Sequence, residues 1–133
     1  MHRISPELPL RLGLGLVYLY SGINLISHPT AWVWALPYWL RSLIDAVIPL
    51  KWYLQIQGGI EIVFAIVFLT WFLPRGIVRI VAFLSTLEFL AILILAFAPF
   101  SEANFLITFR DMGLLGASVA LMLLITKKEI RST

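Results

Sequence analysis

The sequence predicts an all-α integral membrane protein, a bundle of four membrane-spanning helices with an interfacial or re-entrant aromatic segment between the first two. Three observations support this fold class. The 133-residue chain is 61% hydrophobic and only 13% charged, whereas soluble domains carry roughly 45–50% apolar and about 25% charged residues. Four apolar stretches have about the length that crosses a bilayer. Polar residues in the first stretch recur at three- and four-residue steps, as on one face of a helix.

The first span is expected at residues 10–27, after a polar lead-in that ends at Pro9. At about 1.5 Å per residue it covers roughly 27 Å, close to the hydrocarbon thickness of about 30 Å. No small-residue cleavage pattern follows it, so we expect this span to remain in the mature protein. The polar face near its end, which we expect to point into protein, carries Tyr20 or Ser21, Asn24, and Ser27 or His28. Close packing against another helix is expected at Gly13, Gly15 and Gly22.

Residues 29–50 form the aromatic segment, which prolines interrupt at Pro29, Pro37 and Pro49. Tryptophan and tyrosine favour the membrane interface, so we place this segment as a re-entrant or surface-lying helical piece. Its aromatic residues are Trp32, Trp34, Tyr38 and Trp39. Simple anchoring is the favoured role, and the alternative is that these side chains cap or line a binding site.

Three further spans are expected at residues 52–73, 77–98 and 105–126. A basic turn at Pro74 ends the second span, and Pro99 stops the third. Residues 101–104 make a polar link, and the chain closes with the charged tail Lys127, Lys128, Glu129 and Arg131.

The ten basic residues indicate orientation rather than nucleic-acid binding, because they form no block or stripe. Four spans place both termini on one side, and the basic residues of that side are Arg3, Arg11, Arg75, Arg79, Lys127, Lys128 and Arg131. The opposite side has Arg41 and Lys51. The positive-inside rule therefore predicts a multi-pass protein of the cytoplasmic membrane with both termini in the cytoplasm.

A layer of charged residues inside the predicted spans forms the candidate site. Helix rise puts Glu61 and Glu88 roughly 15 Å from the outer edge, with Arg110 and Asp111 nearer to it, at roughly 9–11 Å. An isolated charge at this depth costs about 2.5–3.5 kcal/mol, so these groups must be paired or hydrated. Ionisation of all three acids beside a single guanidinium costs free energy, so we predict that Glu61 or Glu88 is protonated at pH 7. These four residues are the catalytic candidates.

Helical phase predicts which side chains meet. Gln57 lies one turn before Glu61, whereas Arg110 lies about 100° away from Asp111 around the fourth helix. We therefore expect that Arg110 does not face Asp111 and reaches instead to Glu61 or Glu88. The polar stripe of that helix is Asn104, Thr108, Asp111, Leu115 and Ser118. Candidate ligand-binding residues are Asn24, Gln57, Ser85, Thr108, Trp34 and Trp39. The alternative interpretation is that these polar groups only hold the helices together by hydrogen bonds.

Short motifs in this chain resemble the DoxX family of small four-helix membrane proteins. The motifs are Arg11-Leu-Gly-Leu-Gly, Gly58-Gly-Ile-Glu61, Pro74-Arg75 and Arg110-Asp111-Met-Gly-Leu-Leu-Gly116. The resemblance implies a four-helix bundle, and some relatives, of the DoxD type, form the membrane subunit of a thiosulfate:quinone oxidoreductase. It also maps the family's polar positions onto Glu61, Arg110 and Asp111. Relatives often carry a lysine where this chain has Asn24, which weakens the expectation of an anionic substrate there.

The leading functional hypothesis is a redox-linked subunit that binds a quinone or similar lipophilic partner. In it, Glu61 or Glu88 exchanges protons and Arg110 orients a carbonyl oxygen. One alternative is a small proton-coupled transporter, although transporters of the small multidrug resistance type carry their key acid in the first helix. Another alternative is a non-catalytic membrane anchor for soluble oxidoreductases. Further candidate partners are the lipid bilayer, an oxidoreductase subunit, soluble or membrane-bound, and a second copy of the chain.

The absence of cysteine excludes disulfides, thiolate ligands and haem attachment through cysteine. We expect no covalent cofactor. We also expect no metal site, because His28 is a lone histidine at the boundary of a span and metal sites need several ligands.

Overall fold

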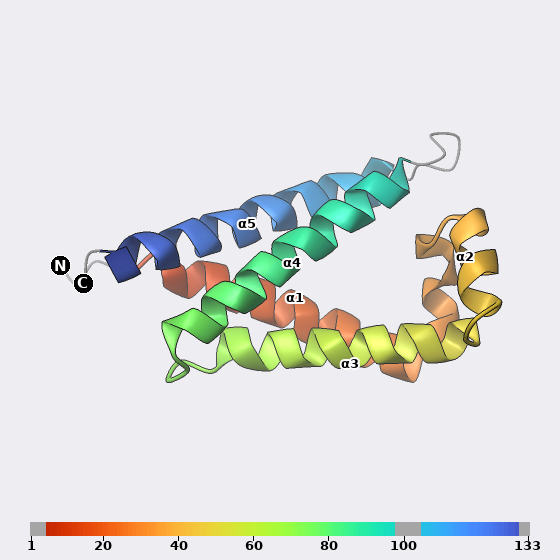
Figure 1. The fold of residues 1–133 in the computed structure, drawn as a ribbon, viewed down its shortest axis with the longest axis horizontal. Coiled ribbons are helices and arrows are strands. Elements are labelled where there is room, and N and C mark those ends of the chain that lie inside the picture. The colour runs from red at the N-terminus through yellow and green to blue at the C-terminus, as the bar shows by residue number, and fades with distance from the viewer. Residues whose placement is uncertain (1–4, 98–104, 131–133) are drawn as a thin grey trace.

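The computed structural model describes residues 5–97 and 105–130, and within these ranges the regular elements are all helices, as predicted. The long helices run along the molecule, and a short helical segment lies at one end of them (Figure 1). The elements are α1 (Glu7–Ser27), the 3₁₀ helix η1 (Pro29–Ala35), α2 (Tyr38–Asp45), α3 (Leu50–Leu69), α4 (Arg75–Ala96) and α5 (Phe105–Ile130).

Within the described part of the chain, three helices are long and apolar enough to cross a membrane, those at Glu7–Ser27, Leu50–Leu69 and Arg75–Leu95. They coincide with the first three predicted spans. The fourth predicted span lies in α5, which is 26 residues long and continues into the charged tail as far as Ile130. The predicted link at residues 101–104, the last residue of the third predicted span and Pro99 lie outside the described residues.

The four long helices form two pairs, because α1 packs most extensively with α3 and α4 with α5. Although α3 and α4 follow each other in sequence, they diverge from their connecting turn (Figure 1). The first pair is close because two glycines face each other: a Cβ atom at Gly22 would lie 2.9 Å from the carbonyl oxygen of Gly58. Gly13, which was expected to serve the same purpose, does not, since a Cβ there would meet nothing within 4 Å.

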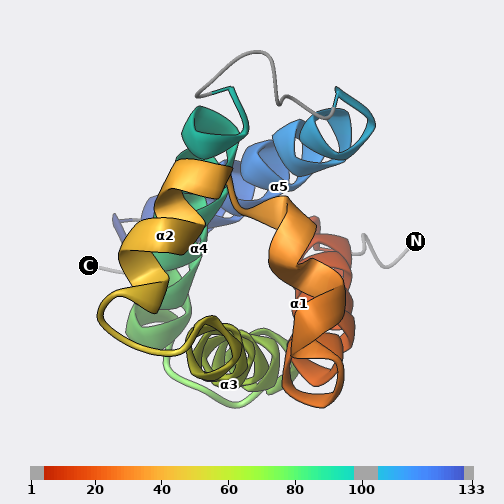
Figure 2. The ribbon, with the colours of Figure 1, turned by 90° about the vertical axis from the view of Figure 1, so that its right-hand side faces the viewer.

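The two ends of the molecule differ. At the terminal end, α1 begins and α5 ends; at the opposite end, here called the aromatic end, η1 and α2 lie over the ends of the long helices (Figures 1 and 2). The core lies between the helix pairs and is centred on Tyr18, which is 2% exposed. The Tyr18 ring packs against the rings of Phe64, Phe68 and Phe89, at centroid distances of 5.3, 6.1 and 5.5 Å.

At the terminal end, Arg11 joins α1 to the last turn of α3. Only 3% of this residue is exposed, and Nη1 pairs with Glu7 Oε1 at 3.4 Å. The other nitrogens donate to three backbone carbonyl oxygens, those of Val67 (3.2 Å), Phe68 (2.9 Å) and Thr70 (2.7 Å). The last carbonyls of a helix have no partner within it, so the guanidinium completes the end of α3. The helix α3 ends at Leu69 and not at the predicted residue 73, and Arg11 binds the carbonyls at this end.

Candidate functional site

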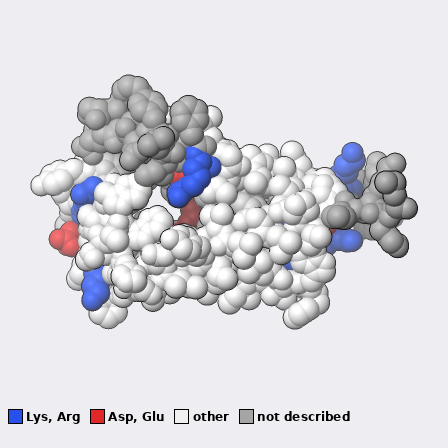
Figure 3. Space-filling view, turned by 180° about the vertical axis from the view of Figure 1, so that it is seen from behind, with Lys and Arg blue, Asp and Glu red and all other residues white. Residues whose placement is uncertain are grey.

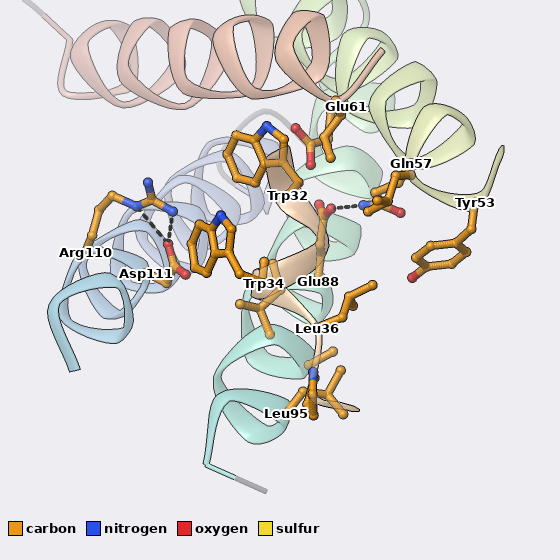
Figure 4. A pocket seen from close by; sticks show the side chains of 16 residues that line it. Trp32, Trp34, Leu36, Tyr53, Gln57, Glu61, Glu88, Leu95, Arg110 and Asp111 are labelled. Atoms are coloured by element: carbon orange, nitrogen blue, oxygen red, sulfur yellow. Dashed lines mark hydrogen bonds and ion pairs between the residues drawn. The ribbon is translucent and has the colours of Figure 1, made fainter. Parts of the chain in front are cut away.

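A cavity of about 360 Å³ lies at the aromatic end, between the two helix pairs and beside η1 (Figure 4). Its volume falls within the range of small-molecule sites, and its lining is mostly apolar with a few convergent polar groups, as such sites are. The lining residues are Leu25, Trp32, Trp34, Ala35, Leu36, Pro37, Tyr53, Leu54, Gln57, Glu61, Glu88, Ala91, Ile92, Leu95, Arg110 and Asp111. Every long helix and η1 therefore contribute to one site.

Six of the ten candidate site residues line this cavity: Gln57, Glu61, Glu88, Arg110, Asp111 and Trp34. Ser85, Asn24 and Trp39 are not part of the lining. Ser85 is fully buried beside the cavity. The backbone oxygen of Asn24 accepts a hydrogen bond from the backbone amide of His28 at 2.7 Å. Trp39 is 44% exposed on α2. Thr108 lies outside the residues whose side chains the structure describes.

Hydrogen bonds from two other helices hold the carboxyl group of Glu88, on α4. The Tyr18 hydroxyl donates to Glu88 Oε2 at 2.8 Å, and Gln57 Nε2 donates to Glu88 Oε1. A hydroxyl has a single proton, so Ser85 must be the donor in its 2.8 Å contact with the Tyr18 oxygen. Ser85 therefore acts on Glu88 only through Tyr18. Both oxygens of Glu88 accept a hydrogen bond.

Glu61, one turn after Gln57 on α3, is 8% exposed. It accepts a hydrogen bond from the Ser21 hydroxyl of α1. Its carboxyl group also interacts electrostatically with Glu88 and, more weakly, with Arg110. The two acids are thus close enough to influence each other, and the donors that hold them are the uncharged groups of Tyr18, Gln57 and Ser21.

The prediction that Arg110 does not face Asp111 is wrong, because its guanidinium pairs with that neighbouring acid. Towards the acids on the other helices, Arg110 acts on Glu61 through its charge. Arg110 Nε and Nη2 each lie 3.0 Å from Asp111 Oδ1, on the neighbouring residue. Helical phase fixes the direction of the Cβ atom, but a long arginine side chain can fold back around its own helix. The Asp111 side chain is 4% exposed and that of Arg110 is 59% exposed. Arg110 therefore neutralises Asp111 at the rim of the cavity.

The face of the molecule opposite to that of Figure 1 is hollowed at this point (Figure 3). A basic side chain stands at the rim of the hollow and acidic atoms are visible inside it. This view agrees with the exposure of Arg110 and the burial of the acids. The cavity is therefore accessible from the side of the helix bundle.

Aromatic side chains form a wall of the cavity. Trp32 and Trp34 of η1 stack with ring centroids 6.3 Å apart and planes at 21°. Figure 4 shows both indoles beside the acids, with Tyr53 on the other side of Gln57. Trp32 and Trp34 therefore line the cavity, whereas Trp39 does not.

Sequence reasoning missed Tyr18, Ser21 as the specific partner of Glu61, and Tyr53. Tyr18 lies one turn before Gly22, on the face of α1 that packs against α3, and that spacing is the signal that points to it. Tyr53 lies one turn before Gln57. Among the described residues, no three histidine, aspartate or glutamate side chains gather closely enough to hold a metal ion.

No protein-family model, curated protein or solved structure matches the chain. The resemblance to the DoxX family therefore stays a prediction based on short motifs. What supports a function is the cavity itself, with an acid pair held by uncharged donors beside an aromatic wall.

Proposed function

We propose that this protein is a redox-linked subunit of the cytoplasmic membrane, similar to DoxX proteins, whose cavity binds a quinone or a similar lipophilic partner. The single observation that carries the proposal is the presence of Glu61 and Glu88 together in a mostly apolar cavity beside stacked tryptophans. An apolar molecule with a polar, proton-exchanging head fits both features of this site.

The surface of the long helices supports placement in a bilayer. Large aliphatic side chains are exposed along all four of them, for example Leu16 (58%), Ile66 (55%), Ile80 (57%) and Leu123 (60%). Soluble monomers rarely expose apolar surface on this scale, whereas lipid covers it without cost. In this proposal α1, α3, α4 and α5 all cross the membrane. Both termini face the cytoplasm, and η1 and α2 lie at the outer surface.

The chemistry follows from the groups that face the cavity. Reduction of a quinone to a quinol consumes protons, and oxidation of the quinol releases them, so a carboxyl group beside the ring can supply or accept them. Glu61 and Glu88 are placed for this task, and Arg110 retains Nη1, which is not engaged by Asp111, for a carbonyl oxygen. Electrons come from a partner oxidoreductase subunit.

Tryptophan fluorescence tests the proposal, because quinones quench it at short range. The purified protein in lipid nanodiscs is titrated with a short-chain benzoquinone. We expect saturable quenching that is clearly reduced in Trp34→Phe, in which a wall of the cavity loses its indole. Trp71→Phe is the matched control, since Trp71 lies beside Arg11 at the terminal end. Quenching that does not saturate, or that depends equally on both tryptophans, contradicts the proposal.

Single cysteines test the topology, because the natural chain contains none. Ser42→Cys introduces a thiol at an exposed position of α2, and Gly76→Cys introduces one in the α3–α4 turn region, where a Cβ meets nothing within 4 Å. A membrane-impermeant maleimide should label Ser42→Cys in intact cells and Gly76→Cys only after lysis. Labelling of both in intact cells, or the opposite pattern, contradicts the proposed orientation.

A further inference from the structure

The charges of the cavity do not balance. Among the described residues, its lining contains three acids, Glu61, Glu88 and Asp111, and one base, Arg110. The guanidinium of Arg110 is engaged by Asp111 through two nitrogens at 3.0 Å. The acid pair on α3 and α4 is left with uncharged hydrogen-bond donors only, as far as the described residues show.

Two neighbouring carboxyl groups in an apolar cavity have two states of low free energy. In one state the pair is protonated, and in the other a bound cation takes the place of the proton. The other titratable or charged groups around the pair are Tyr18 from α1, Tyr53 from α3, and the Arg110–Asp111 pair from α5. The cavity residues from η1 are uncharged. Arg110, the one base among the described lining residues, acts on Glu61 only through its charge, because two of its nitrogens bind Asp111.

The walls indicate which kind of cation fits. Metal ions require a cage of several oxygen ligands, whereas here aromatic and aliphatic side chains surround the two carboxyl groups. The faces of tryptophan and tyrosine attract organic cations, and Trp32, Trp34 and Tyr53 stand around the acids (Figure 4). A volume of about 360 Å³ accommodates a bulky organic ion rather than a bare metal ion.

We infer that the cavity also binds lipophilic organic cations, which enter in exchange for a proton held by the Glu61–Glu88 pair. The incoming positive charge replaces the proton, which leaves to solvent, so the charge of the cavity is unchanged. This inference uses the same cavity as the proposed quinone site, but it depends on the charge imbalance and not on redox chemistry. The two kinds of ligand should therefore compete.

Tetraphenylphosphonium is a suitable probe, because it is lipophilic, permanently charged and has no proton to donate. Its binding to the full chain in nanodiscs is followed by tryptophan fluorescence, and a pH indicator in weak buffer counts the protons. We expect about one proton released per bound cation, and an affinity that rises with pH by about tenfold per unit where that exchange occurs. Uncharged triphenylphosphine oxide should bind about tenfold more weakly or worse.

Charge-removing variants identify the source of the proton. Glu61→Gln and Glu88→Gln should each abolish proton release and weaken tetraphenylphosphonium binding by about tenfold or more. Asp45→Asn is the matched control, because Asp45 is an exposed acid of α2 that accepts a bond from the backbone amide of Leu50, as asparagine also can. Thermal unfolding in detergent verifies that each variant is folded. Glu61→Asp, which keeps an acid, should restore proton release.

The outcomes separate this inference from the proposed function. Cation binding without proton release, or equal binding of the charged and uncharged probes, overturns the exchange. Saturable quinone binding together with no cation binding overturns the inference and leaves the proposed function standing. Cation binding with proton release but without quinone binding supports the inference and rejects the quinone proposal.

Discussion

Each end of the helix bundle contains buried charged residues, and the two ends differ in the groups that bind these residues. At the terminal end, Arg11 donates hydrogen bonds to three backbone carbonyl oxygens and forms an ion pair with Glu7. At the aromatic end, Glu61 and Glu88 line a cavity, and their hydrogen-bond donors among the described residues are uncharged. The first arrangement is complete without a ligand. The second keeps its charge facing a space that a ligand can occupy.

The difference shows that burial alone does not identify a functional charge. Arg11 is buried more completely than Glu61, at 3% against 8% exposed. Both residues border a cavity, so what distinguishes them is where their hydrogen bonds go. Arg11 donates mainly to backbone carbonyl oxygens, which stabilises the fold, whereas the acids are held by side chains and remain available for chemistry. The comparison predicts that substitutions at the terminal end reduce stability and substitutions at the aromatic end reduce binding.

The largest loss of stability is expected for Arg11→Leu. This change strands the carbonyl oxygens at the end of α3, and each buried orphan acceptor costs roughly 1–3 kcal/mol. Arg75→Leu is the control, since Arg75 is an exposed arginine at the same end. Thermal unfolding in detergent measures the difference. A stability loss no greater for Arg11→Leu than for Arg75→Leu contradicts a structural role for Arg11.

A smaller but clear loss is expected for Gly22→Val. The new side chain meets the carbonyl oxygen of Gly58 and forces α1 away from α3, and overpacking of this kind costs about 1–3 kcal/mol. Gly13→Val makes the same chemical change on the same helix where a Cβ meets nothing within 4 Å. The two variants are compared by yield and unfolding temperature, and equal behaviour rejects the close contact between the helices.

A still smaller loss of stability is expected for Arg110→Leu. It leaves Asp111, which is 3% exposed, without its ion-pair partner, but the lost partner was itself largely exposed to solvent. We expect a loss of roughly 1 kcal/mol, with partial recovery in the double variant Arg110→Leu, Asp111→Asn. A full additive loss in the double variant shows that the two residues are not coupled.

The smallest effect on stability is expected for Glu61→Gln, which keeps the shape of the side chain and its contact with Ser21. We expect a change below about 1 kcal/mol in unfolding free energy, combined with loss of proton exchange. Unfolding and ligand binding are measured on the same preparation. If Glu61→Gln unfolds as readily as Arg11→Leu, the acid is structural and the contrast between the two ends disappears.

Much of the fold could be predicted from the sequence, because apolar length and helical spacing determine it locally. The sequence also placed Glu61 and Glu88 at one level of their helices, and both line the same cavity, since helix rise and phase are regular. The ends of elements were less predictable. The end of α3 depends on Arg11, a residue of another helix, which no local pattern contains.

The details of the site depend on side-chain reach and on the packing of distant helices. Arg110 was assigned the wrong partner because phase describes the start of a long side chain and not its end. Tyr18 went unnoticed because a buried tyrosine in an apolar helix is recognised only by what its hydroxyl meets. Asn24 was expected at the site, but its neighbour Leu25, which lies about 100° further around α1, lines the cavity instead.

Infrared difference spectroscopy of the carboxyl groups tests the central contrast most directly. Spectra of the protein in nanodiscs are recorded near pH 7 before and after addition of the short-chain benzoquinone. We predict a protonated carboxyl band in the free protein that shifts on ligand binding and disappears in the double variant Glu61→Gln, Glu88→Gln. Two ionised carboxylates at pH 6, or ligand binding that leaves the carboxyl bands unchanged, would contradict the account.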